Sequence, residues 1–105
     1  MAHETIVQNL EDRLRSSNYD LILNSTDYKV HGKHGECDML AIRGDYTLLF
    51  EVKGRDRSKD RRKAYLQLKK DVEWVYERFP DTYRIFCFYV YRDKQIDVIE
   101  WYQNI

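Results

Sequence analysis

The chain has 105 residues, in which 18 Lys and Arg residues balance 18 Asp and Glu residues, with 43% hydrophobic and 14% aromatic residues. This length suits one compact domain spanning 1–105, and the apolar content is enough for a core, which excludes an intrinsically disordered chain. No apolar run approaches the ~20 residues that cross a bilayer, and the first residues lack the pattern of a signal peptide. The two cysteines provide no disulfide framework. We expect a soluble, intracellular domain in the cytoplasm, or in the host cytoplasm if the protein is viral.

Apolar spacing predicts a helix over about residues 3–17 and then a short strand at Leu21–Leu23, followed by a polar and Gly-containing stretch. Two longer strands follow, over 36–43 and 46–53. Gly44-Asp45 between them suits the two-residue turn of a hairpin. Both strands are apolar at neighbouring positions, which is typical of strands that are covered on both faces.

The strongest helical pattern covers about residues 60–79 and ends before Pro80. Its apolar stripe consists of Tyr65, Leu68, Val72, Val75, Tyr76 and Phe79. A buried strand over 83–91 and an edge strand over about 95–101 complete the chain. Because a helix separates the strands at 46–53 and 83–91, we expect these two strands to run parallel. The order α-β-β-β-α-β-β predicts an α/β fold with a mixed sheet flanked by helices.

The predicted hairpin brings acidic side chains together. With the turn at 44–45, Asp38 lies opposite Glu51, and Glu36 lies opposite Lys53 in the same patch. Two opposed carboxylates repel each other, but Mg²⁺ between them makes their proximity favourable. Lys53 would then orient an attacking water or stabilise charge that develops on a phosphate. The alternative is an ordinary cross-strand ion pair between Glu36 and Lys53.

Charge is distributed unevenly along the chain. Residues 53–70 contain nine Lys or Arg residues and two Asp residues, a net charge of +7, so the remaining chain carries −7. A basic segment on a neutral protein suits phosphate binding, although a solvated loop and helix start gives the same pattern. The residues that we expect to contact a nucleic-acid backbone are Lys33, Arg55, Arg57, Lys59, Arg61, Arg62 and Lys63.

The segment Gly35-Glu36-Cys37-Asp38, followed after twelve residues by Glu51-Val52-Lys53, resembles the motif of the PD-(D/E)XK nuclease superfamily, without the Pro that usually opens it. Within that superfamily the chain is most similar to archaeal Holliday-junction resolvases. It is also similar to a small bacterial group of resolvase-like proteins with a GExD…FVEVK signature. The similarity covers most of the chain, from the N-terminal helix to the strand at 83–91, and implies a restriction-endonuclease-like core.

The resemblance implies roles for the residues of the hairpin. Asp38, Glu51 and the backbone carbonyl of Val52 would bind Mg²⁺, for which Mn²⁺ would substitute. Lys53 would activate or position the hydrolytic water. The implied activity is hydrolysis of DNA phosphodiester bonds by a metal-dependent endonuclease.

The resemblance also points to residues on the helices. Gln67 lies where related nucleases often carry a glutamine near the site, and a surface position on the second helix is the alternative. The family usually adds a glutamate from the first helix. Here either Glu4 or Glu11 would fill that place, since both lie on the same side of the predicted helix.

The sequence therefore leads to a hypothesis with two alternatives. The resemblance favours a structure-selective endonuclease acting on branched or duplex DNA as a homodimer, because a two-fold dimer supplies the two cuts that a four-way junction requires. A second possibility is another nuclease of the same superfamily, with a nicking, restriction-like or repair role. The third is a protein on the same fold that binds nucleic acid without cutting it.

Overall fold

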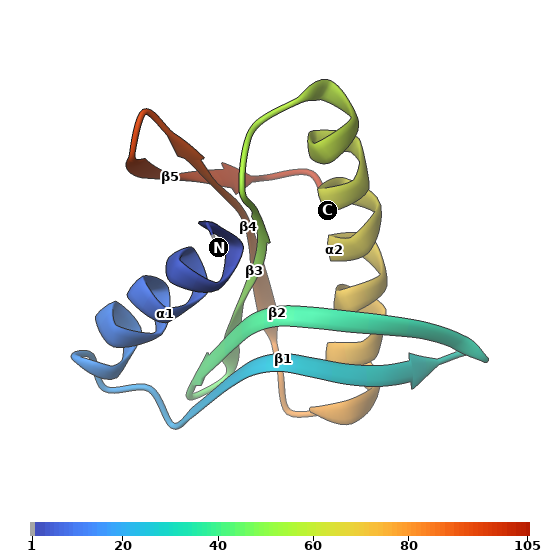
Figure 1. The fold of residues 1–105 in the computed structure, drawn as a ribbon. Coiled ribbons are helices and arrows are strands. Elements are labelled where there is room, and N and C mark those ends of the chain that lie inside the picture. Colours follow the sequence, from blue (N-terminus) through green and yellow to red (C-terminus); the bar gives the residue numbers. More distant parts are fainter. Residues whose placement is uncertain (1) are drawn as a thin grey trace.

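The computed structural model describes residues 2–105, which form an α/β fold with two helices and a five-stranded mixed sheet (Figure 1). The elements are α1 (Ala2–Arg15), β1 (Leu21–Val30), β2 (Lys33–Arg43), β3 (Tyr46–Lys53), α2 (Ser58–Arg78), β4 (Arg84–Asp93) and β5 (Ile96–Tyr102). Strands lie in the order β1-β2-β3-β4-β5, with β3 and β4 parallel and the other pairs antiparallel. The predicted element order and parallel pairing are confirmed. Within the described residues, neither helix is long and apolar enough to cross a membrane.

The two helices lie on opposite sides of the sheet, and each covers a core of its own (Figure 1). The core under α1 contains Ile6, Leu10, Leu14, Met39, Ala41, Phe50, Val52 and Val90. The core under α2 contains Tyr28, Val30, Cys37, Leu40, Leu49, Leu68, Trp74, Val75 and Cys87. The central strands are thus buried on both faces, which explains their consecutive apolar residues.

The buried face of α2 differs from the predicted stripe. Leu68 and Val75 are buried as expected, but Tyr65 and Tyr76 are 39% and 49% exposed. The helix is rotated so that Ala64, Asp71 and Trp74 face the sheet instead, together with Asp60. The prediction failed because apolar residues at helical spacing fit more than one rotation of the helix about its axis. Tyrosine can also lie at the surface, where its hydroxyl group contacts water.

The hairpin of β1 and β2 is longer than the sequence indicated. The strand predicted at Leu21–Leu23 continues to Val30, and β2 begins at Lys33 rather than at Glu36. The turn consists of His31 and Gly32, whose φ angles of 51° and 75° suit a two-residue hairpin turn. Polar residues fill this part of the hairpin because it extends past the rest of the sheet, so that its outer face is solvated (Figure 1).

The long hairpin is attached to α2 through Tyr28. The ring of Tyr28 stacks on Trp74 with ring centroids 4.5 Å apart, and its hydroxyl donates to Asp71 Oδ1 at 2.5 Å. To reach α2, the ring passes over its cross-strand partner Gly35, where a Cβ atom would lie 2.4 Å from Tyr28 Cζ. Only glycine leaves room for this crossing.

We expect Gly35→Ala to lower the free energy of unfolding by about 1–3 kcal/mol, because the added methyl group overpacks the site that Tyr28 fills. Urea denaturation measures the effect. Gly54→Ala is the matched control, since its Cβ would meet its nearest atom, Ala2 Cβ, at an ordinary distance of 3.5 Å. Equal stability of the two variants would contradict this account of Gly35.

Candidate functional site

The site forms where β2 bends away from β3 (Figure 1). The predicted register is confirmed from Arg43↔Tyr46 to Met39↔Phe50, and the pairing of the two strands ends there. Cys37 belongs to the core under α2 and Met39 to the core under α1, so the regular alternation of faces breaks at Asp38. On β1, Ser25 lies at the same level with a φ of 45°. The bend therefore involves both strands.

The bend makes one part of the predicted patch wrong. Glu36 does not lie opposite Lys53, because β2 has left β3 before that level; it pairs with Asp27 of β1 and is exposed. Asp38 also has no backbone partner on β3, yet its side chain stays with that strand. Its Oδ2 accepts a hydrogen bond of 2.8 Å from the backbone N–H of Val52. The carboxylate replaces a strand-to-strand hydrogen bond that the bend removes.

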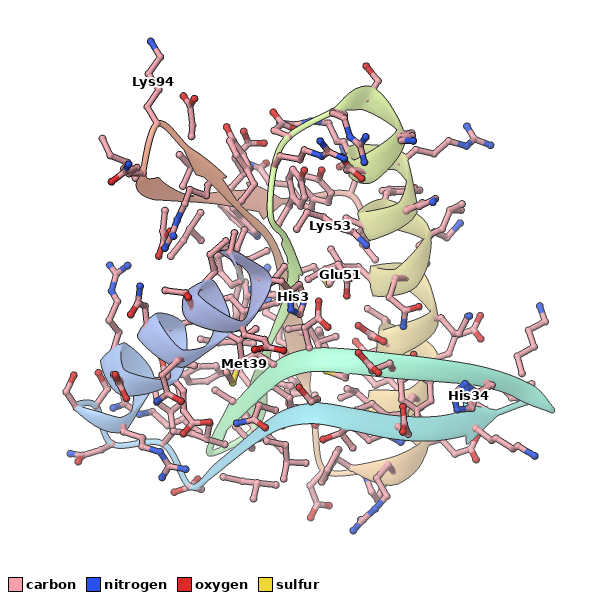
Figure 2. The ribbon with its side chains drawn as sticks, viewed as in Figure 1. His3, His34, Met39, Glu51, Lys53 and Lys94 are labelled. Atoms are coloured by element: carbon pink, nitrogen blue, oxygen red, sulfur yellow. The ribbon has the colours of Figure 1, made fainter. Side chains whose placement is uncertain are left out.

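Glu51 lies beside Asp38 and is as deeply buried, with 5% and 4% of the two residues exposed. Burial, and then the neighbouring charge of Asp38, raise the pKa of Glu51 to about 9. Lys53 Nζ lies 3.4 Å from Glu51 Oε2 and opposes this shift. Figure 2 shows Glu51 and Lys53 projecting into the centre of the molecule, between the beginning of α1 and α2.

The carboxylate pair fits a divalent cation. Oε1 of Glu51 is buried and has no hydrogen-bond partner among the described residues, so one lone-pair acceptor faces the interior without a donor. A cation would satisfy this oxygen and remove the repulsion that raises the pKa of Glu51. In residues 2–105, no three His, Cys, Asp or Glu side chains form a metal-binding group. The pair would therefore offer a cation two carboxylates, and water would have to fill the remaining coordination positions.

Neither glutamate of α1 has a hydrogen bond or ion pair with Asp38 or Glu51 among the contacts of the described residues. Glu4 is exposed, and Glu11 is held by Arg15 at 3.0 Å and by Asn24. A role for Glu4 or Glu11 in the site therefore stays a prediction. The residue of α1 that reaches the site is His3, whose Nε2 lies 3.5 Å from Asp38 Oδ2 (Figure 2).

The sequence held a signal for His3. It precedes Ile6 and Leu10 on the buried face of α1, whereas Glu4 is rotated by one residue toward solvent. The side chain of His3 is 39% exposed, so the imidazole remains accessible at the edge of the site. The family that the sequence resembles usually carries a glutamate at this place, whereas here the residue of α1 beside Asp38 is a histidine.

Gln67 of α2 links the site to the hairpin. Its Nε2 donates to the backbone carbonyl of Glu36 and to Asp71 Oδ1, both at 2.8 Å. Asp71 is fully buried, and burial raises its pKa to about 7. Sequence reasoning missed Asp71, although its spacing of four residues from Gln67 places both side chains on one face of the helix. Gln67 therefore lies near the predicted site and fixes the bend of β2.

A buried thiol precedes Asp38 on β2. Burial raises the pKa of Cys37, and the charges of Asp71, Asp38 and Glu51 raise it further. Cys37 is a free cysteine with 1% exposure, and it packs in the core under α2.

The basic segment divides into two groups. Arg57 is paired with Asp60 at 2.6 Å, and Arg61 with Glu100 at 2.6 Å and Asp56 at 2.9 Å. Arg61 also lies over the ring of Tyr89, 5.0 Å from its centroid. These ion pairs join the loop after β3, α2 and β5, while both arginine side chains stay partly exposed. Contact of Arg57 and Arg61 with nucleic acid therefore stays a prediction.

The other predicted basic residues keep free charges. No ion pair in residues 2–105 involves Arg55, Lys59, Arg62 or Lys63, and all four are exposed. Lys33 is also exposed, and it lies at the start of β2 rather than in a loop.

The carbonyl of Val52 as a metal ligand stays a prediction; the residue itself is buried beside Asp38.

Comparison with known proteins does not assign the chain to a family. No protein-family model matches it. No curated protein matches it either. The function of the site therefore has to be argued from its geometry and from the motif in the sequence.

We expect the free energy of unfolding of the metal-free protein to fall as the pH rises from about 5 to about 9. The pKa of Glu51 is raised from 4.5 to about 9, so within this interval the unfolded state loses a proton that the folded state keeps. Asp71, with its pKa raised to about 7, adds to the decline below that pH. Denaturant titrations in EDTA at several pH values measure the slope.

Glu51→Gln removes the titrating group, so the decline between pH 7 and 9 should largely disappear. Glu36→Gln is the matched control, because Glu36 is an exposed carboxylate on the strand next to the pair. A slope that persists in Glu51→Gln, or that disappears in both variants, would show that another group titrates.

Two neighbouring arginines test the division of the basic segment. Arg61→Ala should destabilise the protein by about 1–2 kcal/mol, because it removes hydrogen bonds to two carboxylates. Arg62→Ala should leave the melting temperature unchanged, since no ion pair of the described residues involves it. Thermal unfolding of both variants measures the two melting temperatures. An equal decrease in both would contradict the structural role of Arg61.

Proposed function

We propose that the chain is a metal-dependent DNA endonuclease of the PD-(D/E)XK type, with a restriction-endonuclease-like core. The observation that carries the proposal is the buried pair Asp38 and Glu51 beside Lys53, in which Glu51 Oε1 has no partner among the described residues. A protein that only binds nucleic acid has no need to bury two repelling carboxylates. The motif in the sequence and the confirmed order of strands around it support the same function.

Mg²⁺ held by Asp38 and Glu51 would supply Lewis-acid activation of the scissile phosphate and support for the leaving oxygen. Asp38 is already oriented by the N–H of Val52 and needs no rearrangement to act as a ligand. Lys53 Nζ, on a side chain that is 26% exposed, lies beside Glu51 and can orient a water entering from solvent. Lys53 also places a positive charge where negative charge develops on the phosphate.

His3 occupies the remaining side of the pair. Its imidazole stands next to Asp38 at the exposed edge of the site, where a phosphate or a water must enter. In this proposal His3, and not Glu4 or Glu11, is the contribution of α1 to the active site. Gln67 acts as a positioning residue, because it holds the backbone of Glu36 two residues before Asp38.

The substrate is proposed from the exposed positive charges. The phosphate backbone would be bound by Arg55, Lys59, Arg62 and Lys63, and such contacts position DNA without reading its sequence. We therefore propose selection of branched DNA, as in a Holliday-junction resolvase, by a homodimer that supplies two active sites.

With Mg²⁺ or Mn²⁺, we expect the purified protein to cut a labelled four-way junction faster than a linear duplex or a single strand of the same sequence. Asp38→Asn and Lys53→Gln should each lower the cleavage rate by at least about 100-fold, since each removes a group that acts on developing charge. Gel analysis of labelled strands measures the rates. Lys94→Gln is the matched control, because Lys94 lies at the tip of the β4–β5 hairpin, away from the site (Figure 2).

The outcomes separate the alternatives. Equal cutting of linear duplex would remove the junction preference and leave a general nuclease of the same type. Binding without cutting of any substrate would favour the non-cleaving alternative. In that case, a thermal shift by Ca²⁺ that is lost in Glu51→Gln would still show that the carboxylate pair binds a cation.

A further inference from the structure

A row of cations runs along one exposed flank of α2 and continues onto the β1–β2 hairpin. Lys59, Lys63, Leu66 and Lys70 follow at intervals of four, three and four residues, so they share one side of the helix. Lys70 Nζ donates to the backbone carbonyl of His34 at 3.0 Å, which joins this flank to the hairpin. We name Lys33, Lys59, Lys63, Lys69 and Lys70 the α2 track.

The far end of the track is a hollow between the helix and the hairpin. Lys33 of β2 lines it together with Leu66, Lys69 and Lys70 of α2, and Glu73 is its acidic neighbour. No ion pair in the described part of the chain involves a lysine of the track. Lys69 Nζ lies 5.6 Å from the centroid of the Tyr65 ring, and Lys70 bonds a backbone carbonyl, so no carboxylate of the described residues neutralises these charges.

The track passes directly beside the proposed active site. Gln67, which contacts the backbone of Glu36, lies between Lys63 and Lys70 on the helix, one turn from each. A polyanion that follows the track would thus pass Gln67 and the backbone of Glu36, two residues before Asp38.

The spacing of the cations fits a regular row of phosphates. From Lys59 to Lys70 the helix rises by roughly 16 Å at 1.5 Å per residue. B-DNA rises 3.4 Å per base pair, so this span matches about five base pairs. Leu66, which is 52% exposed, is the apolar member of this row, and Lys63, Lys69 and Lys70 lie within one turn of it.

We propose that the α2 track binds one phosphate strand of a DNA duplex, from the loop after β3 across α2 to the β1–β2 hairpin. This inference rests on the proposed function, because it names how the substrate lies at that site. It adds Lys69 and Lys70 to the binding residues and makes the hairpin part of the interface. DNA arms longer than about five base pairs are needed to reach both ends of the track.

The test is the salt dependence of binding, measured by fluorescence anisotropy of a labelled duplex in EDTA, where metal-dependent cleavage is absent. Lys33→Gln/Lys69→Gln removes two track charges and keeps the hydrogen bond from Lys70 to His34. For this variant we expect the slope of log K against log salt to fall by about 1.8, or 0.9 for each lost phosphate contact. The affinity should fall at least about tenfold at low salt.

Arg13→Gln/Lys94→Gln is the matched control, since it removes the same charge from α1 and from the β4–β5 turn, away from α2. The control should keep the slope of the native protein. Equal losses in the two variants would show that net charge alone governs binding and would overturn the track. Circular dichroism confirms that each variant is folded.

The outcome also separates the track from the proposed nuclease activity. If the native protein cuts DNA but Lys33→Gln/Lys69→Gln binds with an unchanged slope, the track is wrong and the activity stands. If the slope falls as expected and no DNA is cut with any divalent metal, the track stands and the activity is wrong. Failure of the native protein to bind duplex overturns the track.

Discussion

The burial of two neighbouring carboxylates at the bend of β2 is the constraint on which the rest of the structure depends. A buried charge is tolerated only when a hydrogen bond, a cation or a proton compensates it. Asp38 is compensated by the N–H of Val52, which the bend itself releases from strand pairing. Among the described residues, Glu51 has an ion pair with Lys53 alone, and its pKa is raised to about 9. The fold thus keeps an incompletely satisfied acid in its interior, a feature typical of sites that act on ligands rather than of structural cores.

The sequence was sufficient for the parts of the fold that local chemistry decides. The turn at Gly44-Asp45 fixed the register of β2 and β3, and the long helix before β4 fixed the parallel pairing. The bend at Asp38 could not be predicted, because its neighbours form an unbroken strand pattern. Its cause is tertiary, since Gln67 and Tyr28 hold the hairpin against α2. His3 precedes the buried Ile6 and Leu10 on the same face of α1, so its position follows from the apolar spacing, but its contact with Asp38 depends on the bend of β2.

Cations that lie next to each other in the basic segment, residues 53–70, make different contacts in the structure. Arg61 and Arg62 are adjacent in the chain, yet one is enclosed by carboxylates and aromatic rings and the other is free. The difference arises from Glu100, which approaches from a strand 39 residues away. Such partners cannot be read from a local charge pattern. The structure therefore sorts the segment into residues that stabilise the fold and residues that are available to a ligand.

The contact of Tyr28 with α2 across Gly35 bears on the distance between Lys33 and Asp38, which lie on the same strand. The aromatic stack on Trp74 and the hydrogen bond to Asp71 attach the hairpin to α2 two residue pairs before its turn. Five residues of one strand separate Lys33 from Asp38, which corresponds to about 17 Å at full extension. A phosphate bound at Lys33 and a phosphate at the carboxylates would lie at the two ends of this stretch of β2. The fold of the hairpin would then set the distance between these two phosphates before any ligand binds.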